Sequence, residues 1–459
     1  MMELKGKKVL VVGLGRSGLA AALFLRRQGA QVTVSDVRSA ESLAREIPAL
    51  IEEGIVVEAG GHGLLTFRRQ DLIVVSPGVP LETPELAQAR SFGRPVIGEL
   101  ELAARFLKGR ILAITGSNGK TTTTALTGEI LKASGQPTLV AGNIGTPVVE
   151  LIGAATEATW SVLEVSSFQL ESTEQFHPRI AVILNITPDH LDRHGTFGNY
   201  ALAKERIFAA QTDQDYAVLN ADNPRCAEAA ARSHAPVYWF SARRAVERGA
   251  WVEGDELVFR SAPEAAPERI MSLGKIPLKG GHNVENVLAA TCAARLAGVA
   301  ADGIAQAIAG FKAVEHRLEY VATINGVEYY NDSKATNVDA TAKAVAAFPG
   351  GIHLILGGKD KGAPYTPLAP LIRERVQAVY TIGAAAAKIE SELRGETPIH
   401  SCGTLEHAVN AAAAAARPGE VVVLAPACSS FDQFENYEER GRAFKQLVLD
   451  CRGWNPGTA

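Results

Sequence analysis

Several features that would assign a chain to a special class of proteins are scarce or absent here. The five cysteines are scattered without a C-x-x-C pair, which argues against zinc and against a disulfide framework and suits a reducing cytosol. No apolar run approaches the roughly 18 residues needed to span a bilayer. The formal net charge is −4, and no basic stripe of the kind required by nucleic acid is present. We therefore predict a cytoplasmic protein that binds neither membranes nor nucleic acid.

What the sequence does contain is an alternation of short apolar runs and amphipathic segments, which is typical of parallel βαβ units. One series includes "KVLVVG" and "QVTVSD", a second begins at "RILAITG", and a third includes "IHLILGG" and "VVVLAPA". A chain of 459 residues is also too long for one ordinary core. We predict an α/β protein of three domains, at residues 1–99, 100–313 and 314–459.

One segment departs from this alternation. Between Pro236 and Ile276 helical periodicity is poor, and short extended pieces such as "PVYWFS", "GAWVEG" and "ELVFRS" follow one another. Extended pieces without helices between them favour antiparallel pairing. We expect a small antiparallel sheet appended to the middle domain.

The first glycine-rich loop follows the first predicted strand. Gly13, Gly15 and Gly18 form G-x-G-x-x-G, and Asp36 follows about where an acid that binds ribose would lie. This motif alone is weak, because NAD, FAD and simple packing of a helix on a strand all use it. A nicotinamide-dependent oxidoreductase is one hypothesis.

A second glycine-rich loop, "TGSNGKTTTT", is unexplained by that hypothesis. It is two residues shorter than the usual Walker A loop, but the chemistry is the same. Glycines let backbone N–H groups converge on phosphate, Lys120 supplies a positive charge, and Thr121 or Thr122 can bind Mg²⁺. The sequence therefore predicts an ATP-type phosphate site. Its loop residues are Gly116, Ser117, Asn118 and Gly119.

Further ligands for Mg²⁺ are predicted at the ends of the following strands. "VLEVSS" places Glu164 at one strand end, and "ILNITPDH" places His190 just after another. In an open α/β sheet the carboxyl ends of the strands face the ligand crevice. We expect both side chains to converge with the threonines of the second loop on one magnesium–phosphate cluster.

Taken together, the motifs resemble those of the Mur ligases of peptidoglycan synthesis. The matching stretches are "TGSNGKTTT", "HNVEN", "EHRLE" and "NDSKATN", and they extend over essentially the whole chain. Folylpolyglutamate synthases and cyanophycin synthetases share the phosphate loop. "DHLDRHGTFGNYALAKERIF" and "SFDQFENYEERG" resemble in particular the Mur ligases that add D-glutamate to UDP-N-acetylmuramoyl-L-alanine.

The resemblance implies a fold and a reaction. The N-terminal and C-terminal domains would be Rossmann-like, flanking a central P-loop ATPase-type domain. The alanyl carboxylate would attack the γ-phosphate of ATP to give an acyl phosphate, which the amine of D-glutamate then attacks. ATP and two Mg²⁺ ions are the implied cofactors, and a monomer is expected.

The resemblance also implies the residues of the ATP and metal sites. Lys204 matches a lysine that this family carbamylates, which turns a cation into an anionic oxygen ligand. The implied catalytic residues are Lys120, Glu164, His190 and Lys204, and Thr121, Glu164, His190 and Lys204 would bind metal. The ATP site would further include Thr122, Asn286, Arg317, Asp332 and Lys334 with the four residues of the loop.

Two more sets of residues are implied for the substrates. For the UDP-sugar substrate they are Arg16, Ser17, Asp36, Arg38, Gly78, Asn143 and Ser166. For D-glutamate they are Thr336, Lys361, Ser430, Phe431 and Tyr437, where Tyr437 replaces a more common phenylalanine. Two alternatives to this reaction remain besides the oxidoreductase: a related ligase with another amino acid, and a nucleotide-binding regulator without catalysis.

Overall fold

The computed structural model describes residues 2–143, 145–312 and 314–451. The chain divides into two compact units. The first comprises Met1–Ser272 with Val287–Ile308, and the second comprises Leu273–Asn286 with Ala309–Ala459. Among the helices within these described ranges, none is both long enough and apolar enough to cross a membrane.

The N-terminal sheet has the strand order of a doubly wound nucleotide-binding fold. Alternate residues of its first strand enter two separate cores, with Val9 and Val11 in one and Leu10 and Val12 in the other. Both faces of the sheet are therefore covered, as parallel sheets require. In sheet order, the parallel strands are β3 (Val56–Ala59), β2 (Gln31–Asp36), β1 (Lys8–Val12), β4 (Leu72–Val75) and β5 (Val96–Gly98). The helices of this region are α1 (Arg16–Arg27), α2 (Ile47–Glu52), α3 (Leu64–Arg68), α4 (Pro84–Ser91) and α5 (Glu99–Ala104).

The central sheet is built around the strand that carries the phosphate loop. That strand, β6, has a parallel neighbour on each side, β9 and β8. The parallel part runs, in sheet order, through β11 (Val237–Ser241), β10 (Tyr216–Asn220), β9 (Ile180–Ile183), β6 (Arg110–Thr115), β8 (Trp160–Glu164) and β7 (Thr138–Gly142). The helices between and after these strands are α6 (Lys120–Ala133), α7 (Ser167–Glu171), α8 (Leu191–His194), α9 (Phe197–Glu205), α10 (Pro224–Ala229), α11 (Gly281–Leu296) and α12 (Ala301–Gly310).

The expected antiparallel strands are present, but they extend this same sheet and do not form a separate one. The piece "PVYWFS" is β11, and it is parallel to β10 because α10 provides a crossover connection. The next strand, β12 (Gly249–Glu253), is also parallel to β11. The antiparallel pairs are β12 with β13 (Glu256–Arg260) and β13 with β14 (Glu268–Ser272). A tight turn with Gly254 at φ 62° joins β12 to β13, which forces the chain to reverse.

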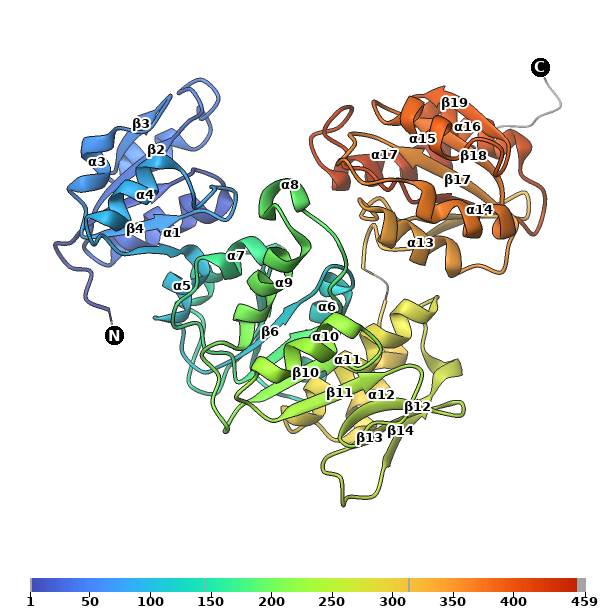
Figure 1. Ribbon diagram of the computed structural model, residues 1–459, viewed down its shortest axis with the longest axis horizontal. Coiled ribbons are helices and arrows are strands. Elements are labelled where there is room, and N and C mark those ends of the chain that lie inside the picture. The colour runs from blue at the N-terminus through green and yellow to red at the C-terminus, as the bar shows by residue number, and fades with distance from the viewer. Residues whose placement is uncertain (1, 144, 313, 452–459) are drawn as a thin grey trace. The chain divides into compact units, whose positions relative to one another are not determined.

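The C-terminal sheet is mostly parallel and again has helices in its connections (Figure 1). Its strands in sheet order are β15 (Glu319–Ile324), β16 (Val327–Asn331), β20 (Val421–Leu424), β17 (Ile352–Gly357), β18 (Val376–Ile382) and β19 (Ile399–Gly403). Only β15 is antiparallel to its neighbour. The helices are α13 (Val338–Ala346), α14 (Ala369–Arg375), α15 (Ala386–Glu392), α16 (Leu405–Ala415) and α17 (Tyr437–Asp450).

Candidate active site

The second glycine-rich loop connects β6 to α6, as the sequence predicts. Gly119 precedes the helix with φ 87°, a left-handed conformation that glycine adopts without strain. The loop is held by Asn185, which follows β9. Its Oδ1 accepts the N–H of Asn118 at 2.9 Å, and its Nδ2 donates to the Asn118 carbonyl at 3.1 Å. Sequence reasoning missed Asn185, although it stands in "ILNIT" directly after a strand.

Two lysines meet at one carbonyl oxygen of this loop. Lys120 Nζ donates to the carbonyl of Gly116 at 2.8 Å and to that of Ser117 at 2.9 Å. Lys204 Nζ, from α9, donates to the same Gly116 carbonyl at 2.9 Å. The Lys120 ammonium makes the loop attractive to an anion such as phosphate, and the Lys204 amine lies directly beside it.

Lys204 is not the surface lysine that its helical context alone would favour. Its side chain is 1 % exposed, and its ammonium lies 4.6 Å from the ring centre of Tyr200. Burial, and then the charge of Lys120, lower the pKa of Lys204 well below its ordinary value, against a smaller opposing effect of Asp189. A buried amine with a lowered pKa loses its proton readily, which makes it nucleophilic.

Glu164 and Asn143 meet beside the phosphate loop. Glu164 ends β8, is 1 % exposed and stands opposite Ile114 of β6. Its Oε1 accepts from Asn143 Nδ2 at 3.0 Å, and the Asn143 N–H donates to the Glu164 carbonyl at 2.8 Å. The structure therefore brings together a predicted metal ligand and a residue predicted to contact the substrate.

His190 occupies an unusual backbone position just before α8. Its φ is 51°, a left-handed conformation that is uncommon for a residue other than glycine. The N–H of His190 donates to Asp189 Oδ1 at 2.9 Å, and its ring packs edge-on against Phe168 with centroids 4.9 Å apart. The side chain is 37 % exposed and so remains accessible to a ligand. Thr121 and Thr122 lie buried in the first turn of α6.

The donor set at these strand ends suits magnesium. Hydroxyl and carboxylate oxygens are the ligands that Mg²⁺ prefers. Thr121 supplies a hydroxyl from the first turn of α6, which follows β6, and Glu164 supplies a carboxylate from the end of the adjacent strand β8. His190 supplies an imidazole after β9, on the other side of β6. These residues fit a magnesium–phosphate site, and their roles as ligands stay predictions.

A cluster between α7 and α8 was not predicted from the sequence. Glu171 Oε1 lies 3.0 Å from His194 Nδ1, and its Oε2 lies 3.5 Å from Arg193 Nη2. The other ring nitrogen of His194 lies 3.0 Å from Ser167 Oγ. Burial, and then the charge of His190, lower the pKa of His194 to about 4, so this imidazole is neutral at pH 7. The His194 ring contacts Glu171 and Ser167, and so it joins α8, which follows His190, to α7.

Arg193 also reaches the loop after β4. Its Nη2 donates to the carbonyl of Val79 at 2.9 Å, and its Nη1 donates to that of Gly78 at 3.3 Å. Gly78 is one of the residues predicted to lie beside the UDP-sugar. Ser166, in the same predicted set, caps α7: its Oγ accepts from the Gln169 N–H at 3.3 Å.

The first glycine-rich loop is held differently from the second. Asp36 Oδ2 accepts the N–H of Leu14 at 2.6 Å and forms an ion pair with Arg38 at 3.0 Å. Although desolvation raises the pKa of Asp36, the hydrogen bonds from Arg38 and Leu14 outweigh it and lower the pKa to about 2. Arg16 and Ser17 begin α1, where Arg16 is exposed. Asp36 thus shapes the loop in addition to any contact with a ligand.

In the C-terminal domain, two predicted sites share a contact. Lys334, predicted for ATP, donates from Nζ to the hydroxyl of Tyr437, predicted for D-glutamate, at 2.6 Å. Asp332 is partly buried, and desolvation raises its pKa to about 7 against the smaller effect of the Arg317 charge. Asn286 is buried, and its Nδ2 donates to Asn283 Oδ1 at 3.0 Å.

The remaining residues of the predicted D-glutamate pocket lie on neighbouring loops. Lys361 Nζ donates to Thr336 Oγ1 at 3.4 Å. Ser430 is 2 % exposed, whereas Phe431 beside it is 67 % exposed. Arg440, which sequence reasoning missed, is buried and donates to the carbonyls of residues 333, 428 and 429, so it ties these loops together.

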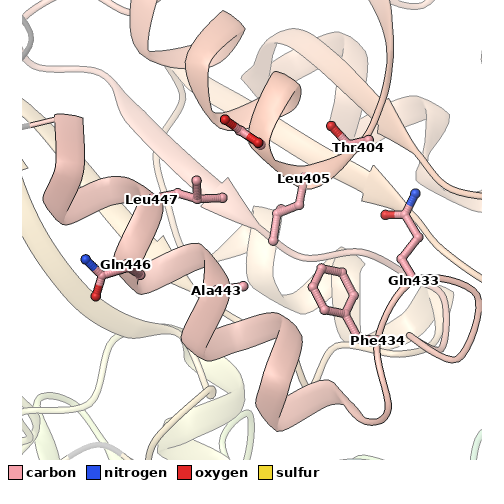
Figure 2. A pocket seen from close by; sticks show the side chains of 8 residues that line it. Thr404, Leu405, Gln433, Phe434, Ala443, Gln446 and Leu447 are labelled. Carbon is pink, nitrogen blue, oxygen red and sulfur yellow. The ribbon is translucent and has the colours of Figure 1, made fainter.

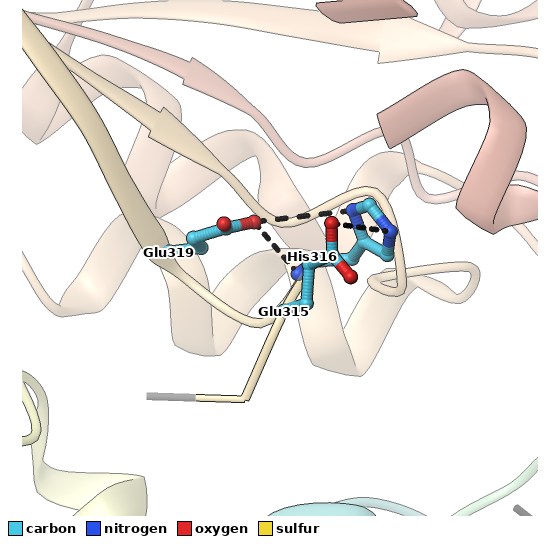
Figure 3. A group of neighbouring side chains, drawn as sticks. All are labelled: Glu315, His316 and Glu319. Atoms are coloured by element: carbon cyan, nitrogen blue, oxygen red, sulfur yellow. Dashed lines mark hydrogen bonds and ion pairs between the residues drawn. The ribbon is translucent and has the colours of Figure 1, made fainter. Parts of the chain in front are cut away.

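Two other features of the C-terminal domain do not belong to the predicted site. Glu315, His316 and Glu319 gather ligand atoms within 4.8 Å of one another (Figure 3), but Lys445 pairs with both carboxylates at 2.5 and 3.0 Å. Lys445 already provides a cation to both carboxylates, and we assign no metal there. A groove of about 590 Å³ (Figure 2) contains none of the predicted residues. It is lined by Thr404, Leu405, Glu406, Gln433, Phe434, Ala443, Gln446 and Leu447.

Three stretches of the chain match models of known protein families. Residues 7–98 match the family described as Mur ligase MurD-like, N-terminal domain, and residues 114–294 match the Mur ligase middle domain. Residues 316–428 match the Mur ligase, glutamate ligase domain. A relative from Acidobacterium capsulatum, named UDP-N-acetylmuramoylalanine--D-glutamate ligase, is 68 % identical over 98 % of each chain. The chain belongs to the Mur ligase family.

Further comparisons agree with membership of the Mur ligases. A relative from Koribacter versatilis with the same name is 60 % identical over 97 % of this chain and 98 % of its own. The solved structure of a pseudomurein peptide ligase type C from Methanothermus fervidus has a TM-score of 0.61 and covers 97 % of this chain and 100 % of its own. At 21 % identity this likeness shows the fold alone. The predicted three-domain α/β fold of the Mur ligases is confirmed.

Proposed function

We propose that this Mur ligase is an ATP-dependent enzyme that joins D-glutamate to UDP-N-acetylmuramoyl-L-alanine in peptidoglycan precursor synthesis. The names of the relatives from Acidobacterium capsulatum and Koribacter versatilis specify this substrate and this amino acid. The observation that carries the proposal is the pair of lysines at the Gly116 carbonyl, with Glu164 at the adjacent strand end. That arrangement suits phosphoryl transfer from ATP to a carboxylate.

In the first step, the alanyl carboxylate attacks the γ-phosphate of ATP, and ADP leaves. A carboxylate is a poor acyl donor, and the new acyl phosphate provides the leaving group that it lacks. Lys120 and the backbone N–H groups of the loop hold the phosphates. Thr121, Glu164 and His190 would hold magnesium, which neutralises phosphate charge when bound.

Lys204 is proposed to act as a carbamate. A neutral amine attacks CO₂, an N–C bond forms, and one proton is released. The lowered pKa of Lys204 favours the neutral amine that this reaction needs. The carbamate would replace a cation, repelled by Mg²⁺, with anionic oxygens that could bind a second ion. Removal of the positive charge would also relieve the repulsion between Lys204 and Lys120.

In the second step, the amine of D-glutamate attacks the acyl carbon, and phosphate leaves through a tetrahedral intermediate. Lys361 offers an ammonium to a carboxylate of glutamate, with Thr336 beside it. Ser430, Phe431 and Tyr437 would complete this pocket. On the nucleotide, Asn286 would contact adenine, and Arg317, Asp332 and Lys334 would contact the rest of ATP.

The N-terminal domain is proposed as the handle for the UDP part of the substrate. The N–H groups at the start of α1, together with Arg16 and Ser17, would receive the diphosphate. Asp36 and Arg38 would lie near uracil with Gly78, and Asn143 and Ser166 near the sugar and peptide. We propose that the enzyme is a cytoplasmic monomer.

Phosphate release from ATP tests the proposal. The purified chain is incubated with UDP-N-acetylmuramoyl-L-alanine and, in separate reactions, D-glutamate, L-lysine or meso-diaminopimelate. Release with D-glutamate alone is expected, and mass spectrometry should detect a product heavier by one glutamyl residue. Release with another amino acid but not with D-glutamate would overturn the proposal. Oxidation of NADH without any dependence on ATP would instead support the oxidoreductase.

A further inference from the structure

The hydroxyl of Tyr437 joins two groups that the proposed function assigns to different ligands. Tyr437 is the first residue of α17 and belongs to the proposed D-glutamate pocket. Its hydroxyl accepts a hydrogen bond from Lys334 Nζ at 2.6 Å, and the same ammonium lies 4.1 Å from the centre of the ring. Lys334, which follows β16, is proposed to contact ATP. The contact therefore links the amino-acid side of the site to its phosphate side.

The backbone around this contact is fixed by other groups. Ser333 Oγ donates to the carbonyl of Tyr437 at 2.8 Å. Arg440, one turn further along α17, donates from Nε to Ser333 Oγ at 3.0 Å and from Nη2 to the Ser333 carbonyl at 2.8 Å. Asn436 caps the same helix by accepting the N–H of Glu439 at 2.8 Å. Removal of the phenol oxygen should therefore leave the loop and the helix in place.

The Tyr437 hydroxyl can influence the position of the Lys334 side chain. Lysine carries its charge at the end of four flexible carbons, so its position depends on the groups that receive its hydrogen bonds. A hydroxyl that accepts from the ammonium sets both a direction and a distance, whereas the face of a ring attracts a cation with little directional preference. A phenylalanine at position 437 would keep the second contact and lose the first.

We propose that the Tyr437 hydroxyl is a positioning group that acts through Lys334, holding its ammonium in place for an anionic phosphate of the nucleotide. This inference rests on the proposed function, because that proposal assigns Lys334 to ATP. It differs from a direct contact between Tyr437 and glutamate, since the effect of the hydroxyl passes through the lysine. The neighbouring N–H of Thr336, which donates to the Lys334 carbonyl at 2.8 Å, places the glutamate pocket directly beside this lysine.

Four proteins test the proposal: wild type, Tyr437→Phe, Lys334→Ala and the double variant. Tyr437→Phe is expected to raise the KM for ATP about three- to tenfold, as for the loss of one hydrogen bond, with the KM for D-glutamate changed less than about twofold. In the Lys334→Ala background the same substitution should have no further effect. Equal effects in both backgrounds, or an increase confined to the KM for D-glutamate, would overturn the proposal.

A binding measurement separates this inference from the proposed function. Calorimetric titration with Mg²⁺ and a non-hydrolysable ATP analogue is carried out on the same four proteins, without any amino acid present. The same non-additive pattern is expected in the dissociation constants. If wild type used an amino acid other than D-glutamate, the proposed function would fail, and this cycle would still decide the role of Tyr437. Additive effects in the titration would overturn the inference by themselves.

Tyr320→Phe is the matched control. Tyr320 is 53 % exposed in the same domain, and its hydroxyl pairs with Thr323 Oγ1 at 2.8 Å. Loss of that hydroxyl should leave the KM for ATP and the dissociation constant unchanged. Thermal melting of each variant shows whether the domain remains folded. A loss of nucleotide binding in Tyr437→Phe that is accompanied by a lower melting temperature, and is matched by Tyr320→Phe, would count against positioning.

Discussion

The two glycine-rich loops both join a buried strand to the start of a helix, yet their surroundings differ in charge. The loop that includes Gly13 and Gly15 has a carboxylate, Asp36, bound to one of its N–H groups. The loop that includes Gly116 and Gly119 has the side-chain nitrogens of two lysines, Lys120 and Lys204, on one carbonyl. Similar local backbones thus support different chemistry, because side chains from distant parts of the chain determine the charge of each loop.

The comparison also separates two uses of glycine. At Gly18 a Cβ would lie 1.9 Å from the carbonyl oxygen of Gly13, so glycine is needed there for close packing of helix on strand. At Gly119 the reason is the left-handed backbone, with φ 87°. We interpret the first loop as a holder for the substrate and the second as the site of phosphoryl transfer. The following predictions test that division, beginning with the largest expected effect.

Lys120→Met should lower kcat for phosphate release by about a hundred- to a thousandfold, because a charged group that stabilises the transferred phosphate is lost. Calorimetric affinity for the UDP-sugar substrate should be unchanged, since the first loop is intact. Lys132→Met, at an exposed position near the end of the same helix, is the control and should retain full activity. A loss of affinity for the UDP-sugar in Lys120→Met would contradict the division between the loops.

Lys204→Ala should lower kcat by about a hundredfold, because the proposed anionic ligand is absent. Added bicarbonate should not restore activity, since alanine has no amine to react with CO₂. Native-condition mass spectrometry of the wild-type chain should detect the added mass of one CO₂, and that mass should be missing in the variant. Full activity in Lys204→Ala would remove the carbamate proposal.

Gly18→Ala should reduce stability by about 1–3 kcal/mol, because the new Cβ forces the first loop to shift. Gly15→Ala is a matched control: its φ is −76°, and a Cβ there would meet no atom within 4 Å. Gly15→Ala should therefore preserve stability. Hydrogen exchange over residues 8–36 measures both effects. Equal destabilisation by the two substitutions would show that packing is not the reason for glycine at position 18.

Asp36→Asn should have the smallest effect, about 1 kcal/mol at pH 7, because Arg38 is partly exposed and water screens the ion pair. The pKa of Asp36 is lowered from 3.8 to about 2 on folding, so its carboxylate stabilises the fold above pH ~4. This contribution is lost as the pH falls through about 2. The difference between wild type and variant in hydrogen exchange at Leu14 should shrink over that range. Glu52→Gln, at an exposed position of the same domain, is the control and should leave hydrogen exchange at Leu14 unchanged at pH 7.

Much of the fold could be predicted from the sequence, because parallel βαβ units leave a clear local pattern. Apolar runs such as "KVLVV" and "RILAIT" are β1 and β6, and a helix follows each loop, α1 from Arg16 and α6 from Lys120. The interpretation of β11 was wrong, since an extended piece does not reveal whether its partner is reached by a helix or by a turn. The sequence of a single strand does not determine which strand it pairs with or in which direction, because both depend on the rest of the sheet.

The candidate site could be predicted in part. The loop residues and Lys120 could be proposed from the sequence because their spacing is local, and their roles stay predictions. Asn185, Arg193 and Arg440 were missed because their hydrogen bonds join residues far apart in the chain. Lys204 was recovered only through the resemblance, since its helix alone favours an exposed position. The burial of a helical side chain depends on which other elements pack against its helix, and this packing is a property of the tertiary structure.

The sequence by itself determined the positions of the glycines and the positive charge of Lys120 after the second loop. It also determined the alternation of apolar runs and amphipathic segments that favours parallel sheets. These are local properties of neighbouring residues. Only the tertiary structure decided that β6 lies between β8 and β9, which brings Glu164 beside the phosphate loop and Asn185 onto its backbone. It likewise placed the amine of Lys204 away from water against the Gly116 carbonyl. Electrostatic interactions depend on distance and burial in space, and neither can be read from separation along the chain.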